Sequence, residues 1–320
     1  MKILVPLNNE ANILEYINVG ADELYMGFFD LKWLKRFGKY ADINRMSGFG
    51  EYANKYCFEE MIFIAKKIKK LNRSVFVTMN ANSYNREQIE YIQEHYLPQI
   101  YDANVDGVIV SNLELGKVVK NYGITPVAST MCAIYNSEIA QIYKENGIKR
   151  LILPRDISLN EIQNISSKVS GLQLEIFFMR NGCFFSDCYC LGMHRPECGA
   201  TCAMLRSHKK NIISTRKDFN HRHDIALNEQ IYNKFFHNDA CAMCALYRLI
   251  KMGVNSLKIV GRADNSHAVC KDIEITRRNI QIAESCSSEM EYLEKMIFPF
   301  NSIKNCCMGL SCYYPEVRFY

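Results

Sequence analysis

Short apolar runs recur along the whole chain, and longer amphipathic stretches separate most of them. Most of the runs are continuously apolar instead of alternating, which is typical of strands buried on both faces of a parallel sheet. This pattern constrains the fold more than any other feature of the sequence. Eight strands are predicted, at residues 2–6, 23–27, 74–79, 106–110, 125–129, 150–154, 172–178 and 255–260.

Several of the stretches between these runs carry apolar residues at helical spacing, which predicts amphipathic helices. In the last of them Ser158 is expected to act as the N-cap, and Glu161 completes a capping box. Gly123 and Gly147 stand at positions where a C′ glycine ends a helix. The predicted helices cover residues 58–71, 86–104, 113–123, 136–147 and 158–169.

The succession of strands and helices predicts a parallel (β/α)8 barrel of the TIM type. A doubly wound open sheet is the alternative, because a count of strands does not show closure. About 75 residues separate the seventh strand from the eighth, far more than a usual connection. A loop that follows a barrel strand opens on the C-terminal face, so this insertion is expected at the barrel mouth. The predicted units are 1–182 (strands one to seven), 183–244 (cysteine-rich insertion), 245–300 (last strand and helix) and 301–320 (cysteine-containing tail).

The start of the chain lacks the apolar core and cleavage site of a signal peptide, and no run of 18 apolar residues occurs. We therefore expect a cytoplasmic protein without membrane insertion. The net charge of +5 predicts a mildly basic surface rather than a nucleic-acid footprint.

The insertion concentrates thiols to a degree that ordinary core packing does not require. Since disulfides are rare in a reducing compartment, metal or redox chemistry is favoured. The spacings are irregular, and only Cys241 and Cys244 form a CxxC knuckle, so an iron–sulfur cluster is favoured over zinc, with uncoordinated thiols as a third interpretation. No partners can be assigned to Cys306, Cys307 and Cys312 in the tail. The thiols of the insertion are Cys183, Cys188, Cys190, Cys198, Cys202, Cys241 and Cys244.

Several motifs together resemble the collagenase-like peptidase family U-32 over about residues 2 to 285. The more specific ones are EIFFMRNGCFFSDCYCLG (175–192) and DACAMCALYRLIKMGVNSLKIVGR (239–262). The chain departs from the family pattern in carrying Met179 and Arg180 in place of His-Gly, and Val260 in place of a glutamate. The other matching motifs are LVP (4–6), GAD (20–22), LYMG (24–27), VTMN (77–80), NVDGVIV (104–110), VASTM (127–131) and GIKRLILPRDISL (147–159).

The resemblance implies an iron–sulfur protein with a [4Fe–4S] cluster. Cys183, Cys190 and Cys198 match cluster ligands of the family, and the fourth ligand is Cys202 or Cys241. Family members with established chemistry hydroxylate RNA bases or quinone precursors without molecular oxygen, and prephenate is the oxygen donor of several. The resemblance thus implies a small-molecule or RNA substrate, and also allows a protein partner of the same family.

A barrel places strand ends at the mouth, which yields the candidate site residues. Arg155 and Arg262 follow predicted strands and are expected to bind an anion, and Arg180 lies next to the cysteines. Glu175 lies inside the seventh predicted strand, where acid–base work and pairing with Lys258 or Arg155 are both open. Three further residues are expected to hydrogen-bond a substrate: Asn80, Ser129 and Thr130.

Two other functions are weighed against hydroxylation. A peptidase is the weaker hypothesis, because the sequence offers no GxSxG, no HExxH and no plausible Cys/His pair. A non-catalytic protein in which a cluster or zinc ion is structural is the other.

Overall fold

The computed structural model describes residues 1–180, 182–183, 186–190, 240–262, 264–299 and 312–317. The predictions for Cys198, Cys202, Cys306 and Cys307 lie outside these ranges.

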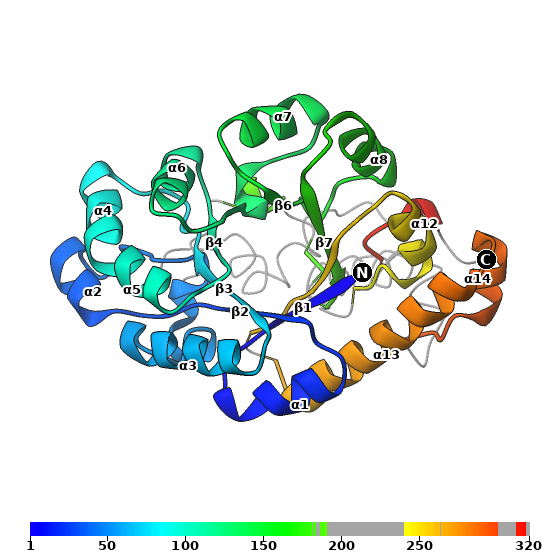
Figure 1. The fold of residues 1–320 in the computed structure, drawn as a ribbon, viewed down its shortest axis with the longest axis horizontal. Helices are drawn as coiled ribbons and strands as arrows, with labels where there is room; N and C mark the ends of the chain where they lie inside the picture. The colour runs from blue at the N-terminus through cyan, green and yellow to red at the C-terminus, as the bar shows by residue number, and fades with distance from the viewer. Residues whose placement is uncertain (181, 184–185, 191–239, 263, 300–311, 318–320) are drawn as a thin grey trace, which may run out of the picture.

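Eight parallel strands close into a barrel in the order of the sequence (Figure 1). Closure is made by β8 on β1, where Lys2 pairs with Ser256 and Leu4 pairs with Lys258. The predicted TIM-type barrel is therefore confirmed, and the open doubly wound sheet is excluded. The strands are β1 (Lys2–Pro6), β2 (Glu23–Met26), β3 (Ser74–Met79), β4 (Gly107–Val110), β5 (Pro126–Ala128), β6 (Arg150–Ile152), β7 (Gln173–Met179) and β8 (Ser256–Ile259).

Helices surround the barrel and turn their apolar faces toward it. The capping box of Ser158 and Glu161 is present, with Ser158 Oγ accepting from the Glu161 amide at 3.2 Å. Gly123 and Gly147 follow the C-caps with φ of +87° and +89°, as predicted. The described helices are α1 (Ile13–Asn18), α2 (Leu31–Phe37), α3 (Phe58–Lys70), α4 (Arg86–Tyr91), α5 (Leu97–Asp102), α6 (Leu113–Asn121), α7 (Ser137–Glu145), α8 (Leu159–Lys168), α12 (Leu246–Lys251), α13 (Ser266–Ser285) and α14 (Glu289–Lys295).

The helix predicted over 86–104 is three segments in the structure. A π-helical segment, Ile92–Tyr96, separates α4 from α5, and Pro98 stands in the first turn of α5. Proline lacks an amide hydrogen and its ring clashes with the carbonyl four residues earlier, so regular α geometry cannot run through Pro98. The wider π turn absorbs this conflict without ending the helical path.

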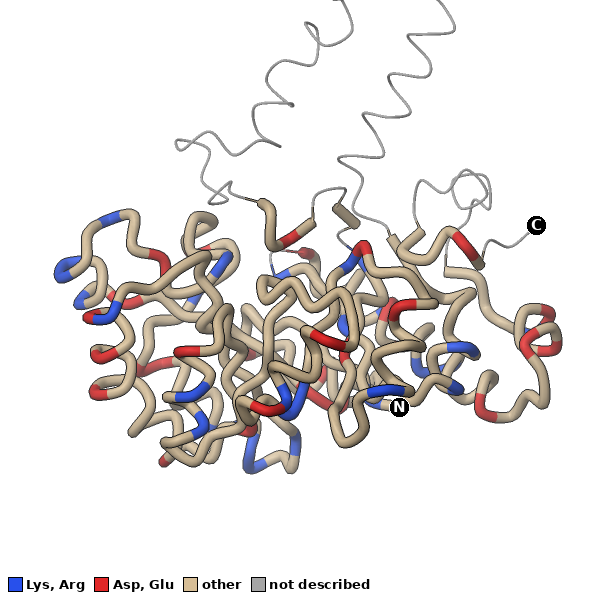
Figure 2. Tube along the Cα trace, turned by 90° about the horizontal axis from the view of Figure 1, so that it is seen from above, with Lys and Arg blue, Asp and Glu red and all other residues tan. Residues whose placement is uncertain are grey.

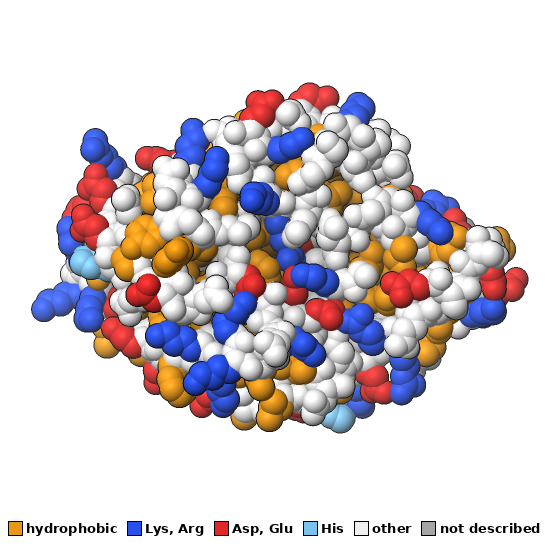
Figure 3. Space-filling model, viewed as in Figure 1, with side chains coloured by type: hydrophobic (Ala, Val, Ile, Leu, Met, Phe, Trp, Pro, Cys, Tyr) orange, Lys and Arg blue, Asp and Glu red, His pale blue; other side chains and the backbone are white. Residues whose placement is uncertain are grey.

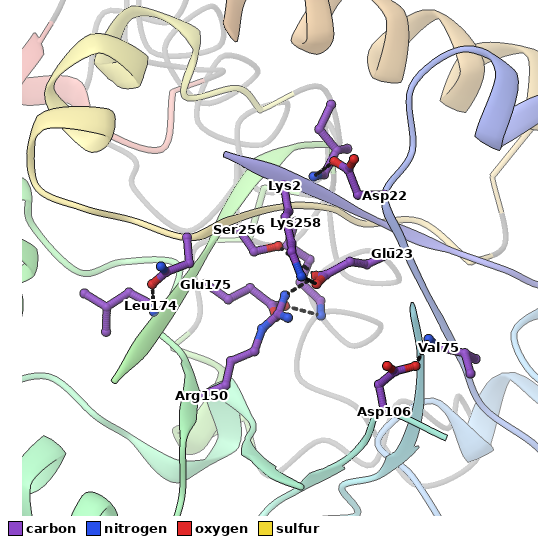
Figure 4. Close-up of polar contacts among 12 residues, drawn as sticks. Lys2, Asp22, Glu23, Val75, Asp106, Arg150, Leu174, Glu175, Ser256 and Lys258 are labelled. Atoms are coloured by element: carbon purple, nitrogen blue, oxygen red, sulfur yellow. Dashed lines mark hydrogen bonds and ion pairs between the residues drawn. The ribbon is translucent and has the colours of Figure 1, made fainter. Parts of the chain in front are cut away.

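Charged side chains fill the barrel interior at the N-terminal ends of the strands (Figure 4). Arg150 contacts Glu23 at 2.5 Å and Glu175 at 2.8 Å, and Lys258 contacts Glu175 at 2.7 Å. These four side chains are at most 7% exposed. The exposed Lys2 side chain also pairs with this network, with its Nζ 2.9 Å from Glu23 Oε1.

An aromatic layer lies above these charges, toward the mouth. The cationic groups of Lys258, Arg150 and Arg155 lie 4.1, 4.7 and 4.4 Å from the ring centroids of Tyr25, Phe76 and Phe177, respectively. Such contacts between a cation and an aromatic ring stabilise charges that burial would otherwise penalise. The barrel is thus a filled core, and its open surface begins above the aromatic layer.

The long connection between β7 and β8 and a short C-terminal segment meet at the end of β7. Cys241 forms bridge pairs with Met179 and with Cys312, and the Tyr313 amide donates to the Cys241 carbonyl at 3.0 Å. Tyr313 is buried, and its ring centroid lies 6.2 Å from that of Phe177. Residues 312–317 therefore pack against the C-terminal end of β7.

The molecular surface carries charges of both signs. Figure 2 shows Lys, Arg, Asp and Glu interspersed along the trace in a side view of the barrel. Figure 3 shows the face at which β1 begins, where acidic and basic side chains again alternate. None of the helices in the described ranges combines the length and apolar character that a membrane span would need.

Candidate functional site at the barrel mouth

One buried carboxylate gathers three side chains at the C-terminal ends of the strands. Asp187 Oδ1 lies 2.6 Å from Arg45 Nη1, and Asp187 Oδ2 lies 3.1 Å from Arg155 Nε. Thr130 Oγ1 donates to Asp187 Oδ2 at 2.9 Å. We call these four residues the Asp187 cluster. Asp187 is 1% exposed, so its charge depends on these partners rather than on water.

Four different segments build this cluster. Arg155 follows β6, and Thr130 follows β5 in a 3₁₀ turn whose N-cap is Ser129. Arg45 comes from the connection between α2 and α3, and Asp187 begins a short 3₁₀ helix within the insertion. Burial would raise the pKa of Asp187, but the charges of Arg155 and Arg45 outweigh it and hold the pKa at about 2. Burial would lower the pKa of Arg155, and the charge of Asp187 raises it instead.

A second group of buried polar side chains surrounds Arg262. Its guanidinium donates to Asn54 Oδ1 at 3.0 Å, to Asn44 Oδ1 at 3.3 Å and to Thr78 Oγ1 at 3.4 Å. We call these four residues the Arg262 cluster. The three acceptors are neutral, and burial lowers the pKa of Arg262 to about 10. A buried arginine held only by neutral acceptors is costly, because arginine is rarely buried without a charged partner.

Gly27 makes room for this cluster at the end of β2. A Cβ placed on Gly27 would lie 2.1 Å from Arg262 Nη1 and 2.1 Å from Asn54 Oδ1. No side chain fits there without moving the arginine or the amide. The glycine of the LYMG motif therefore sets the position of Arg262.

The two clusters are joined through polar residues that the sequence singled out. Asn80 Nδ2 donates to Ser129 Oγ at 2.9 Å, and the Arg45 amide donates to Asn80 Oδ1 at 3.3 Å. Asn44 of one cluster and Arg45 of the other are consecutive in the chain. Asn80, Ser129, Thr130, Arg155 and Arg262 thus lie at one mouth, as their placement at strand ends predicts.

Arg180 and Glu175 lie apart from this group. The Arg180 guanidinium pairs with Asp272 and, at 3.5 Å, with Asp264, so it faces α13. The Arg180 carbonyl accepts a hydrogen bond from the Tyr313 hydroxyl. Glu175 belongs to the charged layer at the opposite end of the barrel, where its partners are Lys258 and Arg150 rather than Arg155. A chemical role for either residue stays a prediction.

Two of the proposed ligand cysteines flank Asp187 in the sequence, Cys183 before it and Cys190 after it. Cys183 and Cys190 are partly exposed, and Cys183 is close enough to Arg155 to influence its pKa. Asn82 Nδ2 contacts the Cys190 carbonyl at 3.5 Å, while Cys241 is buried at the end of β7. In the part of the chain that the structure describes, no three His, Cys, Asp or Glu side chains come together as a metal site. The cluster ligands therefore stay a prediction, since Cys198 and Cys202 lie outside the described residues.

Sequence reasoning did not identify Asp187, Arg45, Asn44 and Asn54 as members of the site. Asp187 did carry a signal, because it is the sole charged residue between positions 181 and 193 of the cysteine-rich stretch. Arg45 carried none, since its connection to the mouth depends on the path of a loop. The two asparagines are equally inconspicuous in the sequence.

Comparison with known proteins places the chain in a family. A family model described as peptidase family U32 matches residues 9–306. An uncharacterized protease of Methanocaldococcus jannaschii is 27% identical over 310 residues, which are 92% of this chain and 69% of that protein. The tRNA hydroxylation protein P1 of Bacillus subtilis is 23% identical, over 92% of this chain and 67% of that protein.

The chain is also similar to an RNA-modifying enzyme over part of that enzyme's length and to a solved structure. The 23S rRNA 5-hydroxycytidine synthase of Escherichia coli is 24% identical over 82% of this chain, but only 36% of that enzyme is covered. A solved structure of a U32 peptidase superposes with a TM-score of 0.49 at 14% identity, covering 82% of this chain and 94% of that one. Because the family model spans nearly the whole chain, the resemblance seen in the motifs is confirmed, and the chain belongs to peptidase family U32.

Proposed function

We propose that this protein takes part in the hydroxylation of an RNA base. The observation that carries the proposal is Arg262, a buried guanidinium at the barrel mouth whose acceptors are neutral. Relatives in the same family are named as tRNA and rRNA hydroxylation proteins. A mouth that holds a buried guanidinium with neutral hydrogen-bond acceptors, and two further arginines that share the single carboxylate of Asp187, is suited to an anionic reactant.

The reactant that fits Arg262 is a carboxylate. Its guanidinium is planar, and each N–H directed at a carboxylate would form a charge-assisted hydrogen bond. An organic oxygen donor of this type, such as prephenate, would bind above the aromatic layer, where Arg262 and Arg155 both lie. Asn80 and Ser129 already bond to each other, so they would orient the donor only by exchanging that hydrogen bond.

We propose a [4Fe–4S] cluster as the cofactor, with zinc as the alternative. The proposed ligands are Cys183, Cys190 and Cys198, with Cys202 or Cys241 as the fourth. Such a cluster would supply one-electron chemistry at the mouth. Anaerobic purification with iron, sulfide and zinc measured on one sample tests this directly. Iron and sulfide in equal amounts support the cluster, while zinc alone or no metal contradicts it.

An RNA substrate would place the activity in the cytoplasm, and a partner protein of the same family stays a prediction. The functional test compares total RNA from a strain lacking the gene with RNA from complemented strains. Nucleosides are analysed by mass spectrometry for a species that carries one additional oxygen atom.

The variant to test is Arg262→Met, which removes the charge and keeps an apolar side chain of similar length. Arg86→Met is the matched control, because Arg86 is 90% exposed on α4. We expect the wild-type gene and the Arg86 variant to restore the hydroxylated nucleoside, and the Arg262 variant to fail. Full restoration by the Arg262 variant would contradict the role of Arg262, and absence of any RNA change on deletion would contradict the proposed function.

A further inference from the structure

A cavity of about 360 Å³ opens beside the Arg262 cluster, between the loop that follows β1 and the loop that follows β8. Its volume lies at the small end of the range for ligand pockets, so it suits a single compact chemical group. Arg262 belongs both to this cavity and to the mouth, which connects the two spaces. Besides Arg262, its lining includes Asn9, Asn12, Glu51, Tyr52, Asp264 and Ser266.

The charges along the cavity argue against a phosphate as its occupant. Arg262 brings one positive charge, whereas Glu51 and Asp264 bring two carboxylates, of which Asp264 is paired with Arg180 at 3.5 Å. A phosphate would meet both carboxylates, and like charges at close range repel. The remaining polar groups are neutral amides and hydroxyls from Asn9, Asn12 and Ser266, which can donate to and accept from an uncharged polar edge.

Tyr52 adds an aromatic surface at the rim. Its side chain is 79% exposed, and its backbone is hydrogen-bonded to Asn8. Asn8 Nδ2 donates to the Tyr52 carbonyl at 2.8 Å, and Asn8 Oδ1 accepts from the Lys55 amide at 3.0 Å. An exposed ring on a fixed loop is a stacking platform, and such platforms bind unpaired bases in single-stranded nucleic acids.

We infer that this cavity binds an unpaired nucleobase of the RNA, with the base stacked on Tyr52 and its polar edge directed toward Asn9, Asn12 and Ser266. The inference rests on the proposed function and deepens it. A base held here would lie beside Arg262, which also lines the mouth, so the adjacent nucleotide of the strand would reach the mouth. The cavity would then select an unpaired nucleotide next to the one that is modified.

The test measures binding of a fluorescent single-stranded RNA oligonucleotide to the full chain by anisotropy. Tyr52→Ala is compared with Tyr101→Ala, because Tyr101 is also an exposed tyrosine but lies on α5. Loss of one stacked base is expected to weaken binding roughly tenfold. The Tyr101 variant should bind like wild type, and Tyr52→Trp should retain affinity because the larger ring can still stack.

Competition identifies the chemical group that is bound. Free nucleosides should displace the oligonucleotide from wild type, whereas ribose 5-phosphate should not. Equal losses for the Tyr52 and Tyr101 variants, or displacement by ribose 5-phosphate, would overturn the inference. If the Tyr52 variant binds RNA as wild type does while RNA hydroxylation is intact in cells, the cavity assignment fails and the proposed function stands. If deletion of the gene leaves the hydroxylated nucleosides of total RNA unchanged, the proposed function is overturned instead.

Discussion

Asp187 holds one negative charge between two guanidinium groups in a setting that excludes water. An ion pair of this kind gains little net stability over an apolar core of the same shape, but it is costly to break. Arg45 and Arg155 are each about one-tenth exposed, so neither can recover its hydration if the carboxylate is lost. Asp187 therefore ties the cysteine-rich insertion to two distant parts of the barrel.

Asp187→Asn is expected to lower the free energy of unfolding by about 3–5 kcal/mol at neutral pH, because it leaves two buried cations without their shared anion. Urea denaturation measures this change. Asp102→Asn is the control, since Asp102 is exposed on α5 and should change stability by less than about 0.5 kcal/mol. A loss of similar size in both variants would contradict the central position of Asp187.

The pH dependence of stability provides an independent check on the same residue. The folded pKa of Asp187 is about 2, below the value of roughly 3.9 for an unfolded aspartate. Its contribution is thus fully present above about pH 4 and is lost as the pH falls toward 2. Across this window the stability advantage of wild type over Asp187→Asn should shrink by about 2 kcal/mol. Parallel stability curves for the two proteins would show that folding does not lower the pKa of Asp187.

For single residues, the sequence predicted which side chains lie at the barrel mouth better than it predicted which side chains contact one another. Arg155, Thr130 and Arg262 could be placed at the mouth because each follows a strand, and the strand pattern was clear. Asp187 and Arg45 could not be paired with them, because their approach depends on two loops whose paths no periodicity encodes. Of the two partners expected for Glu175, Lys258 is confirmed, whereas the other position is taken by Arg150 of the neighbouring strand β6 instead of Arg155.

At the scale of elements, the start of α8 combines a local and a distant cap. Ser158 Oγ accepts from the Glu161 amide at 3.2 Å, and Glu316 Oε1 of the C-terminal segment accepts from the Leu159 amide at 2.8 Å. The local capping box was predicted from the sequence, because its residues are three positions apart. The contribution of Glu316 was not, because 157 residues separate it from Leu159.

Ser158→Ala is expected to cost about 1 kcal/mol of stability, as loss of an N-cap usually does. Glu316→Ala should cost somewhat less, roughly 0.5 kcal/mol, because this carboxylate is exposed. The two groups bind different amides, so the double variant should show the sum of both losses. Thermal or chemical denaturation of the three variants tests this. A double variant no worse than Ser158→Ala would mean that residues 312–317 do not stabilise α8.

The whole molecule depends on a barrel whose two ends differ in chemistry. The end at which the strands start is closed by charges that satisfy one another, and the mouth holds charges in two clusters. The sequence predicted the strands to within a few residues, because continuous apolar runs mark buried parallel strands. It could not predict closure, since that depends on the pairing of β1 with β8. It also could not decide whether Glu175 is structural or catalytic.

Variants of Glu175 and Lys258 separate these two roles. Glu175→Gln leaves Lys258 and one side of Arg150 without their anion inside the barrel, so stability should fall by about 3–5 kcal/mol. Adding Lys258→Met removes the buried positive charge that Glu175→Gln leaves without an anion, and it packs an apolar side chain against Tyr25, so part of the stability loss should be recovered. Denaturation and RNA hydroxylation are then measured on both variants.

A structural Glu175 predicts that hydroxylation returns together with stability in the double variant, because the mouth above the aromatic layer is unchanged. If Glu175→Gln is instead as stable as wild type but inactive, or if the double variant recovers stability without activity, Glu175 acts in the chemistry and the charged layer is part of the active site.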